Sequence, residues 1–158
     1  MEERTVKSIF TICKQEELPC DEQRLVNKAI EATQNSYSKY SHFSVGAALQ
    51  LDNGEEITGC NQENAAFSVT ICAERTALFT AGAQFPDNAV VKIAIAARNR
   101  EGLLADPITP CGTCRQALIE TEQRFGREVR ILLYGTKHIY VMDGIKNLMP
   151  LSFNEEKL

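Results

Sequence analysis

Four residues in two short segments carry side chains that can bind a metal and move protons. Cys72 and Glu74 stand two positions apart in Cys-Ala-Glu, and Cys111 and Cys114 stand three apart in Pro-Cys-Gly-Thr-Cys. Two thiolates three residues apart in a first helical turn point to the same side and can reach one metal about 2.3 Å away. Cys72 completes a set of three ligands if the two segments lie side by side. Three protein ligands leave tetrahedral zinc one open position for water, as in catalytic sites.

Glu74 is suited to proton transfer rather than to metal binding. It follows Cys72 by two residues, so on an ideal helix its side chain diverges from that of Cys72 by about 200°. From the first turn it can still reach the metal-bound water as a general base. Three thiolates on a divalent cation leave a net charge of about −1, which opposes acidification of that water. Arg75 can hydrogen-bond a thiolate and, with the partial positive charge of two helix N-termini, can offset that charge.

Other interpretations of these residues stay open. Cys-x-x-Cys also occurs as a redox pair, although the usual strand-to-helix setting is absent here. A closed structural zinc site would need a fourth ligand, and the remaining Cys and His residues are Cys13, Cys20, Cys60, His42 and His138. None of these five has the close spacing of a metal ligand to Cys72, Cys111 or Cys114, and we interpret them as structural or incidental. Arg75 could also be a surface charge, and Phe43 and Phe153 ordinary core aromatics.

Three helices are predicted around these segments. Apolar residues at helical spacing indicate a helix over 21–32, with Asp21 as its cap. A second helix is expected over 71–81 with Gly82 as C-cap, and a third runs from Cys114 to Phe125, ending at Gly126. Arg115 lies on the polar side of this third helix.

Five strands are predicted between and after the helices, at 44–51, 55–60, 90–97, 129–134 and 138–142. Asn53-Gly54 between the first two marks a tight hairpin. Residues 5–13 are a candidate edge strand. The order of elements predicts an α/β fold, a three-layer α-β-α sandwich with a mixed sheet of about five strands.

Composition narrows the function classes. The chain has 158 residues, of which 44% are hydrophobic and 24% charged, typical of one globular domain. Its N-terminus is acidic and no apolar run approaches about 20 residues, so we expect a soluble, cytoplasmic protein without a membrane segment. The net charge of −4 and the lack of a basic run disfavour a nucleic-acid partner.

Beyond the metal-binding segments, the chain resembles a known family. Cys-Ala-Glu followed by Pro-Cys-Gly-Thr-Cys resembles the short cytidine deaminases that use three cysteine ligands. Further stretches that look like family segments are 40–49, 59–65, 71–77, 114–116 and 148–150. The resemblance runs from about residue 21 to 153. It implies a zinc-dependent cytidine deaminase domain at 21–158, preceded by an N-terminal extension at 1–20.

The resemblance implies an activity and a cofactor. The chain would bind one Zn²⁺ per subunit and hydrolyse free cytidine and deoxycytidine to uridine and deoxyuridine plus ammonia, a step of pyrimidine salvage. Glu74 would move the protons. Two alternatives remain: a deaminase of another cytosine nucleoside such as blasticidin S, and a non-catalytic zinc-binding protein on the same scaffold.

The resemblance also assigns substrate contacts. Asn61 and Glu63 would bind the ribose hydroxyls, which favours a free nucleoside over a polynucleotide. The amide of Ala73 would face the carbonyl oxygen of the base, the carbonyl of Thr109 the departing amino group, and Phe43 would line the base pocket.

The C-terminus and one substitution bear on assembly. Phe153 stands where the family has a phenylalanine that reaches into a neighbouring subunit's pocket, which implies a homo-oligomer, with a tetramer favoured over a dimer. Phe67 stands where relatives often have tyrosine, so any hydroxyl contact at that position is lost.

Overall fold

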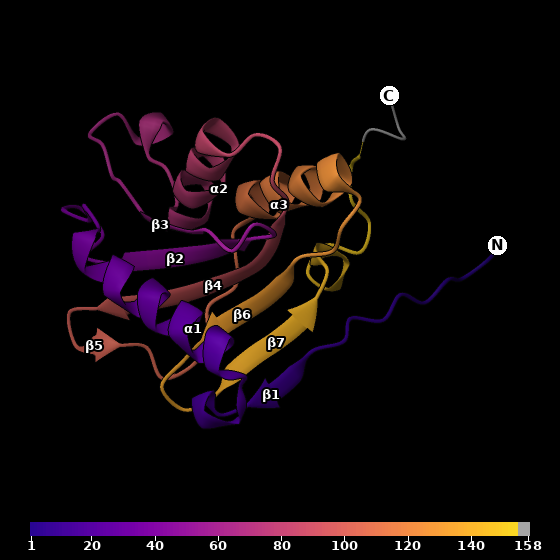
Figure 1. Ribbon diagram of the computed structural model, residues 1–158, viewed down its shortest axis with the longest axis horizontal. Helices are drawn as coiled ribbons and strands as arrows, with labels where there is room; N and C mark the ends of the chain where they lie inside the picture. Colours follow the sequence, from indigo (N-terminus) through magenta and orange to yellow (C-terminus); the bar gives the residue numbers. More distant parts are fainter. Residues whose placement is uncertain (155–158) are drawn as a thin grey trace.

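A computed structural model describes residues 1–154 and shows one mixed β-sheet between layers of helices (Figure 1). The strands are β1 (Thr11–Cys13), β2 (Ser44–Leu51), β3 (Glu56–Cys60), β4 (Val90–Asn99), β5 (Gly102–Leu103), β6 (Arg130–Tyr134) and β7 (Ile139–Asp143). Their order across the sheet is β1-β7-β6-β4-β2-β3, and β5 pairs with β4 at its end. Among the strands of residues 1–154, β4 and β6 are parallel and the other pairs are antiparallel.

Helices cover both faces of the sheet, as the three-layer prediction requires. The α-helices are α1 (Cys20–Ala32), α2 (Ala73–Gln84) and α3 (Gly112–Phe125), and short 3-10 helices lie at Gln15–Glu17, Thr33–Asn35, Phe67–Val69 and Ile145–Asn147. Helix α1 lies on one face, and α2 and α3 lie side by side on the other (Figure 1). None of the helices in residues 1–154 is long and apolar enough to cross a membrane.

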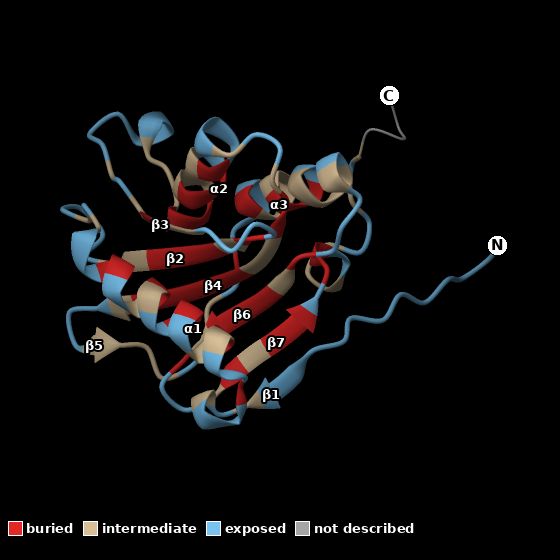
Figure 2. Ribbon diagram, in the orientation of Figure 1, coloured by how far each residue is buried: buried red, intermediate tan, exposed pale blue. Residues whose placement is uncertain are grey.

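Alternation along the strands divides the core in two. In β2, Ala48 packs with the residues under α1, whereas Ala47 and Leu49 pack with those under α2 and α3. In β4, Ala94 and Ile95 divide in the same way. Successive side chains of a strand point to opposite faces, and both faces of the central strands are buried (Figure 2).

The sheet has seven strands among the described residues, where about five and a candidate edge strand were predicted. The five predicted strands are present within one or two residues of their predicted ends. The two others, β1 and β5, have three and two residues, too few for a recognisable alternation. β1 lies within the candidate edge segment 5–13 and pairs with β7 at the sheet edge. Before it, the Ile9 amide donates to Asn147 Oδ1, and the N-terminal end of the chain extends away from the body of the protein (Figure 1).

Two predicted helix ends were wrong. Pro19 is the N-cap of α1, so Asp21 lies inside the first turn, where its carboxylate binds Lys92 at 2.5 Å. Gly82 does not end α2, which continues to Gln84 and has Phe85 as C-cap. Gly126 does end α3, in the left-handed conformation with φ of 60°, as predicted.

Three strand ends and the start of α2 meet at one edge of the sheet. Register pairs Gly46 with Cys60, and Ser44 with Arg98, so β2 begins where β3 and β4 end. Gly59 in β3 brings α2 against the sheet: a Cβ at this position would lie 2.5 Å from the amide nitrogen of Ala77 and 2.6 Å from the carbonyl oxygen of Ala73. The helix that follows Cys72 therefore rests on bare backbone at this edge.

A buried ion-pair network lies on the opposite side, under α1. The Glu22 side chain is buried, and its Oε1 forms ion pairs with the Arg130 Nε at 2.7 Å and the Lys92 Nζ at 3.1 Å. Arg130 also pairs with Asp143 at 3.1 Å. These contacts tie the start of α1 to β4, β6 and β7.

Candidate active site

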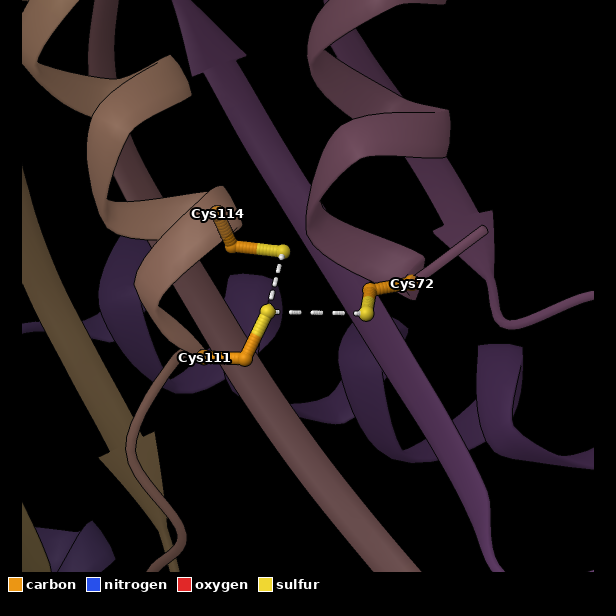
Figure 3. Close-up of side chains that lie close together, drawn as sticks. All are labelled: Cys72, Cys111 and Cys114. Atoms are coloured by element: carbon orange, nitrogen blue, oxygen red, sulfur yellow. Dashed lines mark hydrogen bonds between the residues drawn. The ribbon is translucent and has the colours of Figure 1, made fainter. Parts of the chain in front are cut away.

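The three predicted ligands come together at the starts of α2 and α3 (Figure 3). Cys72 is the N-cap residue of α2 and Cys111 that of α3, and Cys114 lies in the first turn of α3. The Sγ of Cys111 is 3.8 Å from that of Cys72 and 3.5 Å from that of Cys114. All three sulfurs lie within 4.8 Å of one another, so one ion could contact all of them.

The sulfur triangle fits zinc. Tetrahedral zinc with bonds of 2.3 Å separates its sulfur ligands by about 3.8 Å, close to the distances here. All six cysteines are free. Within residues 1–154, no further Cys, His, Asp or Glu belongs to this metal-binding group. The arrangement therefore offers three thiolate ligands and leaves the fourth position open.

Polar contacts around the sulfurs favour a thiolate at Cys72. A hydrogen bond from the Cys114 thiol lowers the pKa of Cys72 to about 5, and Arg75 and Cys111 add to the effect. The same hydrogen bond, together with burial, raises the pKa of Cys114. Arg75 Nη2 lies 3.8 Å from the Cys72 sulfur. A bound dication would remove the remaining thiol protons, because thiolates are the ligands of metals.

Glu74 is a buried carboxylate beside this cluster. Only 4% of the residue is exposed. Burial, with the negative charge of Cys72, raises its pKa above the ordinary value. The ion pairs among the described residues do not include Glu74. A buried carboxyl group with a raised pKa can both accept and return protons.

Asn61 and Phe43 lie together at the edge where β2 begins. Asn61 Oδ1 accepts hydrogen bonds from Ser36 Oγ at 2.6 Å and from the Val45 amide at 2.7 Å, and its Nδ2 donates to the Phe43 carbonyl at 2.9 Å. The Asn61 side-chain amide thus holds the backbone at the start of β2 in place. One of its N–H groups is left for a ligand, because a side-chain amide has two.

Glu63 lies on an exposed turn with Tyr40 and Ser41. Its Oε2 accepts hydrogen bonds from the amides of Tyr40 at 2.7 Å and Ser41 at 3.2 Å. The Ser41 side chain, by hydrogen bonding, holds the pKa of Glu63 below its ordinary value. The same residues line a surface hollow of about 410 Å³ with Phe67 and Thr70. Phe67 is exposed, and its ring meets that of Tyr40 edge-on at 5.9 Å.

Of the other residues assigned by resemblance, Ala73 and Thr109 lie between Cys72 and Cys111 in the chain, and Phe153 follows Cys114. Ala73, fully buried, is the first residue of α2, and its carbonyl rests on Gly59. Thr109 precedes the ligand Cys111 by two residues, and its Oγ1 accepts a hydrogen bond from Arg115. Phe153 is 58% exposed, so its ring is not buried among the residues that the structure describes.

Arg115 and Gln116 were missed as site residues. We placed Arg115 on the polar side of its helix, but its guanidinium folds back onto the backbone that precedes Cys111. Gln116 Nε2 donates to the Phe153 carbonyl at 2.9 Å. Their position directly after a ligand, beside a proline-containing segment, was the available signal.

Comparison with known protein families and relatives agrees with this geometry. Residues 19–126 match the family model described as the cytidine and deoxycytidylate deaminase zinc-binding region. A cytidine deaminase of Halalkalibacterium halodurans is 45% identical over 100 residues, covering 63% of this chain and 71% of the relative. One from Sporosarcina psychrophila is 35% identical over 141 residues, covering 87% of this chain and 95% of the relative.

Solved structures show the same fold. The crystal structure of a cytidine deaminase from Burkholderia pseudomallei superposes with a TM-score of 0.70 at 34% identity, covering 82% of this chain and 97% of that one. The enzyme from Mycobacterium leprae gives a TM-score of 0.63 at 32% identity, with 84% and 99% covered.

Proposed function

The chain belongs to the zinc-binding cytidine deaminases, a family of hydrolases, and from this premise we propose that it deaminates free cytidine and deoxycytidine with Glu74 as the proton carrier. The observation that carries the proposal is the sulfur triangle of Cys72, Cys111 and Cys114 beside a buried Glu74. The reaction consumes one water and yields uridine or deoxyuridine plus ammonia.

Cys72, Cys111 and Cys114 would hold one Zn²⁺ per subunit. With three protein ligands and an open position, zinc supplies a Lewis acid that makes water more acidic. Arg75 supports the ligand set, because its guanidinium contacts Cys72 and carries a positive charge next to three thiolates. Without it the excess negative charge would oppose deprotonation of water.

Glu74 would carry protons in both halves of the reaction. It accepts a proton from the attacking water and passes it to ring nitrogen N3, which makes C4 electrophilic. The water oxygen bonds to C4, and Glu74 then moves the second proton of that water from the new C4 hydroxyl to the amino group. The C4–N bond breaks as the C4 carbonyl forms, and the amino group leaves as ammonia. The raised pKa of Glu74 supports this role, since a carboxyl group that titrates closer to neutrality both takes up and releases protons readily.

Asn61 and Glu63 would bind the sugar. Asn61 has an N–H group to donate, and the Glu63 carboxylate keeps acceptor capacity beyond the two amides it binds. Phe43 is held next to Asn61 and would line the base pocket. The Ala73 amide would bind the base carbonyl oxygen, and the Thr109 carbonyl the amino group.

The active assembly would be a homotetramer of a 21–158 catalytic domain with the extension 1–20. Phe153 and Leu151 are strongly exposed in the single chain. Large apolar side chains exposed together mark interaction sites. Their burial in a neighbouring subunit, with Phe153 in its active site, accounts for this exposure.

The test is turnover by zinc-loaded protein. We expect the ultraviolet absorbance of cytidine and deoxycytidine to change to that of the uracil products, with equimolar ammonia, and cytosine and dCMP to react far more slowly. Turnover of blasticidin S with none of cytidine would favour the alternative substrate. Zinc binding without turnover of any of these compounds would favour a non-catalytic protein, and would count against the proposal.

A further inference from the structure

The backbone that leads into Cys111 depends on one side chain. Residues 104–110 lie in neither helix nor strand, and backbone hydrogen bonds from 136 and 137 reach only as far as Ala105. Among the described residues, Thr109 and Pro110 make hydrogen bonds with Arg115 alone. Arg115 Nε donates to the Pro110 carbonyl at 2.8 Å, and Nη2 to Thr109 Oγ1 at 3.0 Å. The Thr109 carbonyl lies along the chain between these two acceptors, so Arg115 restrains its direction.

The same guanidinium holds the C-terminal segment. Arg115 Nη1 donates to the Leu148 carbonyl at 2.6 Å. Gln116, the next residue, binds the Phe153 carbonyl. The first turn of α3 therefore joins the segment before Cys111 to the segment that presents Phe153.

We propose that Arg115 is a positioning residue: it aims the Thr109 carbonyl at the departing amino group and fixes the C-terminal segment relative to the metal ligands. The inference rests on the proposed function, because it assigns Arg115 a part in that reaction. It adds a residue that touches neither substrate nor metal. Its effect on the chemical step passes through Thr109.

Only arginine can make this set of contacts. Three acceptors from two segments surround one guanidinium, which presents five N–H donors in a rigid plane. A lysine ammonium is a compact point charge on a flexible stem and would not hold all three acceptors in these positions. Arg115→Lys keeps the positive charge and the helix propensity but loses the planar set of N–H donors that reaches all three acceptors.

The variant should lower kcat rather than raise KM. Outer hydrogen-bonding partners of a site typically contribute about 10–100-fold to affinity or activity, and small misplacements of reacting groups have effects of similar size. We expect Arg115→Lys to retain zinc, to lose about 10–100-fold in kcat on cytidine, and to change KM by less than about 3-fold.

An analogue without the amino group separates positioning from general damage. The pyrimidin-2-one ribonucleoside has no amino group to donate a hydrogen bond to the Thr109 carbonyl. Its inhibition constant should therefore change less than about 3-fold in Arg115→Lys. Arg124→Lys is the matched control: Arg124 lies on the same helix and donates to the Pro86 carbonyl. This control should keep kcat, zinc content and analogue binding.

Hydrogen exchange supplies a readout that does not need turnover. Amides of 104–109 and 148–153 should exchange faster in Arg115→Lys than in the wild type or in Arg124→Lys. Unchanged kcat, unchanged exchange, or equal losses of turnover, zinc and analogue binding would each overturn the proposal. Lack of cytidine turnover by the zinc-loaded wild type would instead contradict the proposed function, and exchange would still test the contacts of Arg115.

Discussion

Two glutamates are equally buried on opposite faces of the sheet, yet their surroundings differ. Glu22, in the first turn of α1, is 3% exposed and is bound by Lys92 and Arg130. Glu74, in the first turn of α2, is 4% exposed and lies beside three sulfurs with no ion-pair partner among the described residues. Burial alone therefore does not identify a reactive carboxylate.

The difference lies in what compensates the charge. Glu22 joins three elements, because its ion pairs with two cations offset the loss of hydration on burial. Glu74 has no ion pair among the described residues, and burial raises its pKa, although Arg75 acts in the opposite direction. Such an arrangement is unfavourable for folding and useful for proton transfer. The α1 face is thus organised for stability and the α2–α3 face for chemistry.

Removing a metal ligand should produce the largest effect, because a site that cannot hold zinc has no Lewis acid to make water more acidic. Cys111→Ala leaves two thiolates, and we expect it to lose bound zinc, measured by elemental analysis, and turnover down to background. Cys20→Ala, which alters an exposed cysteine outside the cluster, is the control and should keep both. Full zinc content in Cys111→Ala would break the assignment of the α2–α3 face.

Glu74→Gln should separate catalysis from metal binding. The amide has the same shape but cannot carry the protons, so we expect zinc to be retained and kcat to fall by about 10²–10⁴-fold. Thermal stability should not fall, because an unpaired buried carboxyl group is replaced by a neutral one. Near-normal turnover would show that another group moves the protons.

Glu22→Gln should affect stability and leave activity alone. Breaking a buried ion pair costs about 3–5 kcal/mol, but the Arg130 and Lys92 side chains are 34% and 21% exposed, so we expect a loss of about 1–3 kcal/mol in urea unfolding. Activity per folded molecule should be unchanged. Asp143→Asn, the exposed partner of Arg130, should cost less than about 1 kcal/mol. A selective loss of kcat in Glu22→Gln would remove the contrast between the two faces.

Glu122 gives the smallest effect and a pH signature. Burial raises the pKa of Glu122, although its Oε1 accepts the amides of Val129 and Ile145. An acid with a raised folded pKa binds more protons when folded, so stability falls as pH rises from the ordinary value of 4.5 through the folded pKa. Glu122→Gln keeps an oxygen acceptor and removes this titration. Melting temperatures from pH 4 to 8 should decline less in the variant; an equal decline would exclude Glu122 as a contributor.

The chemistry-bearing segments could be predicted because their signals are local. The spacing of Cys111 and Cys114 and the Asn53-Gly54 turn follow from a few neighbouring residues. The end of α2 could not be predicted: the Phe85 amide still bonds to the Ala81 carbonyl, so the helix passes through Gly82.

Contacts between distant segments are not indicated by the periodicity of the sequence. Helical periodicity placed Arg115 toward solvent, and only folding brings the Leu148 carbonyl within reach of its guanidinium. In the same way, Asp21 had the position of a cap but binds Lys92, 71 residues away. The hydrogen-bond partners of polar side chains can lie far along the chain, so the hydrophobic pattern around such a residue does not predict them.

The bare backbone of Gly59 determines which substitutions the metal centre tolerates. Since α2 rests on this position, even a methyl group would displace the helix that begins directly after Cys72. Selection for zinc retention among random variants should therefore deplete every substitution at Gly59, a residue that carries no ligand and no charge. The cause of this depletion would be the size of any side chain at position 59, even a methyl group, and not its chemical type.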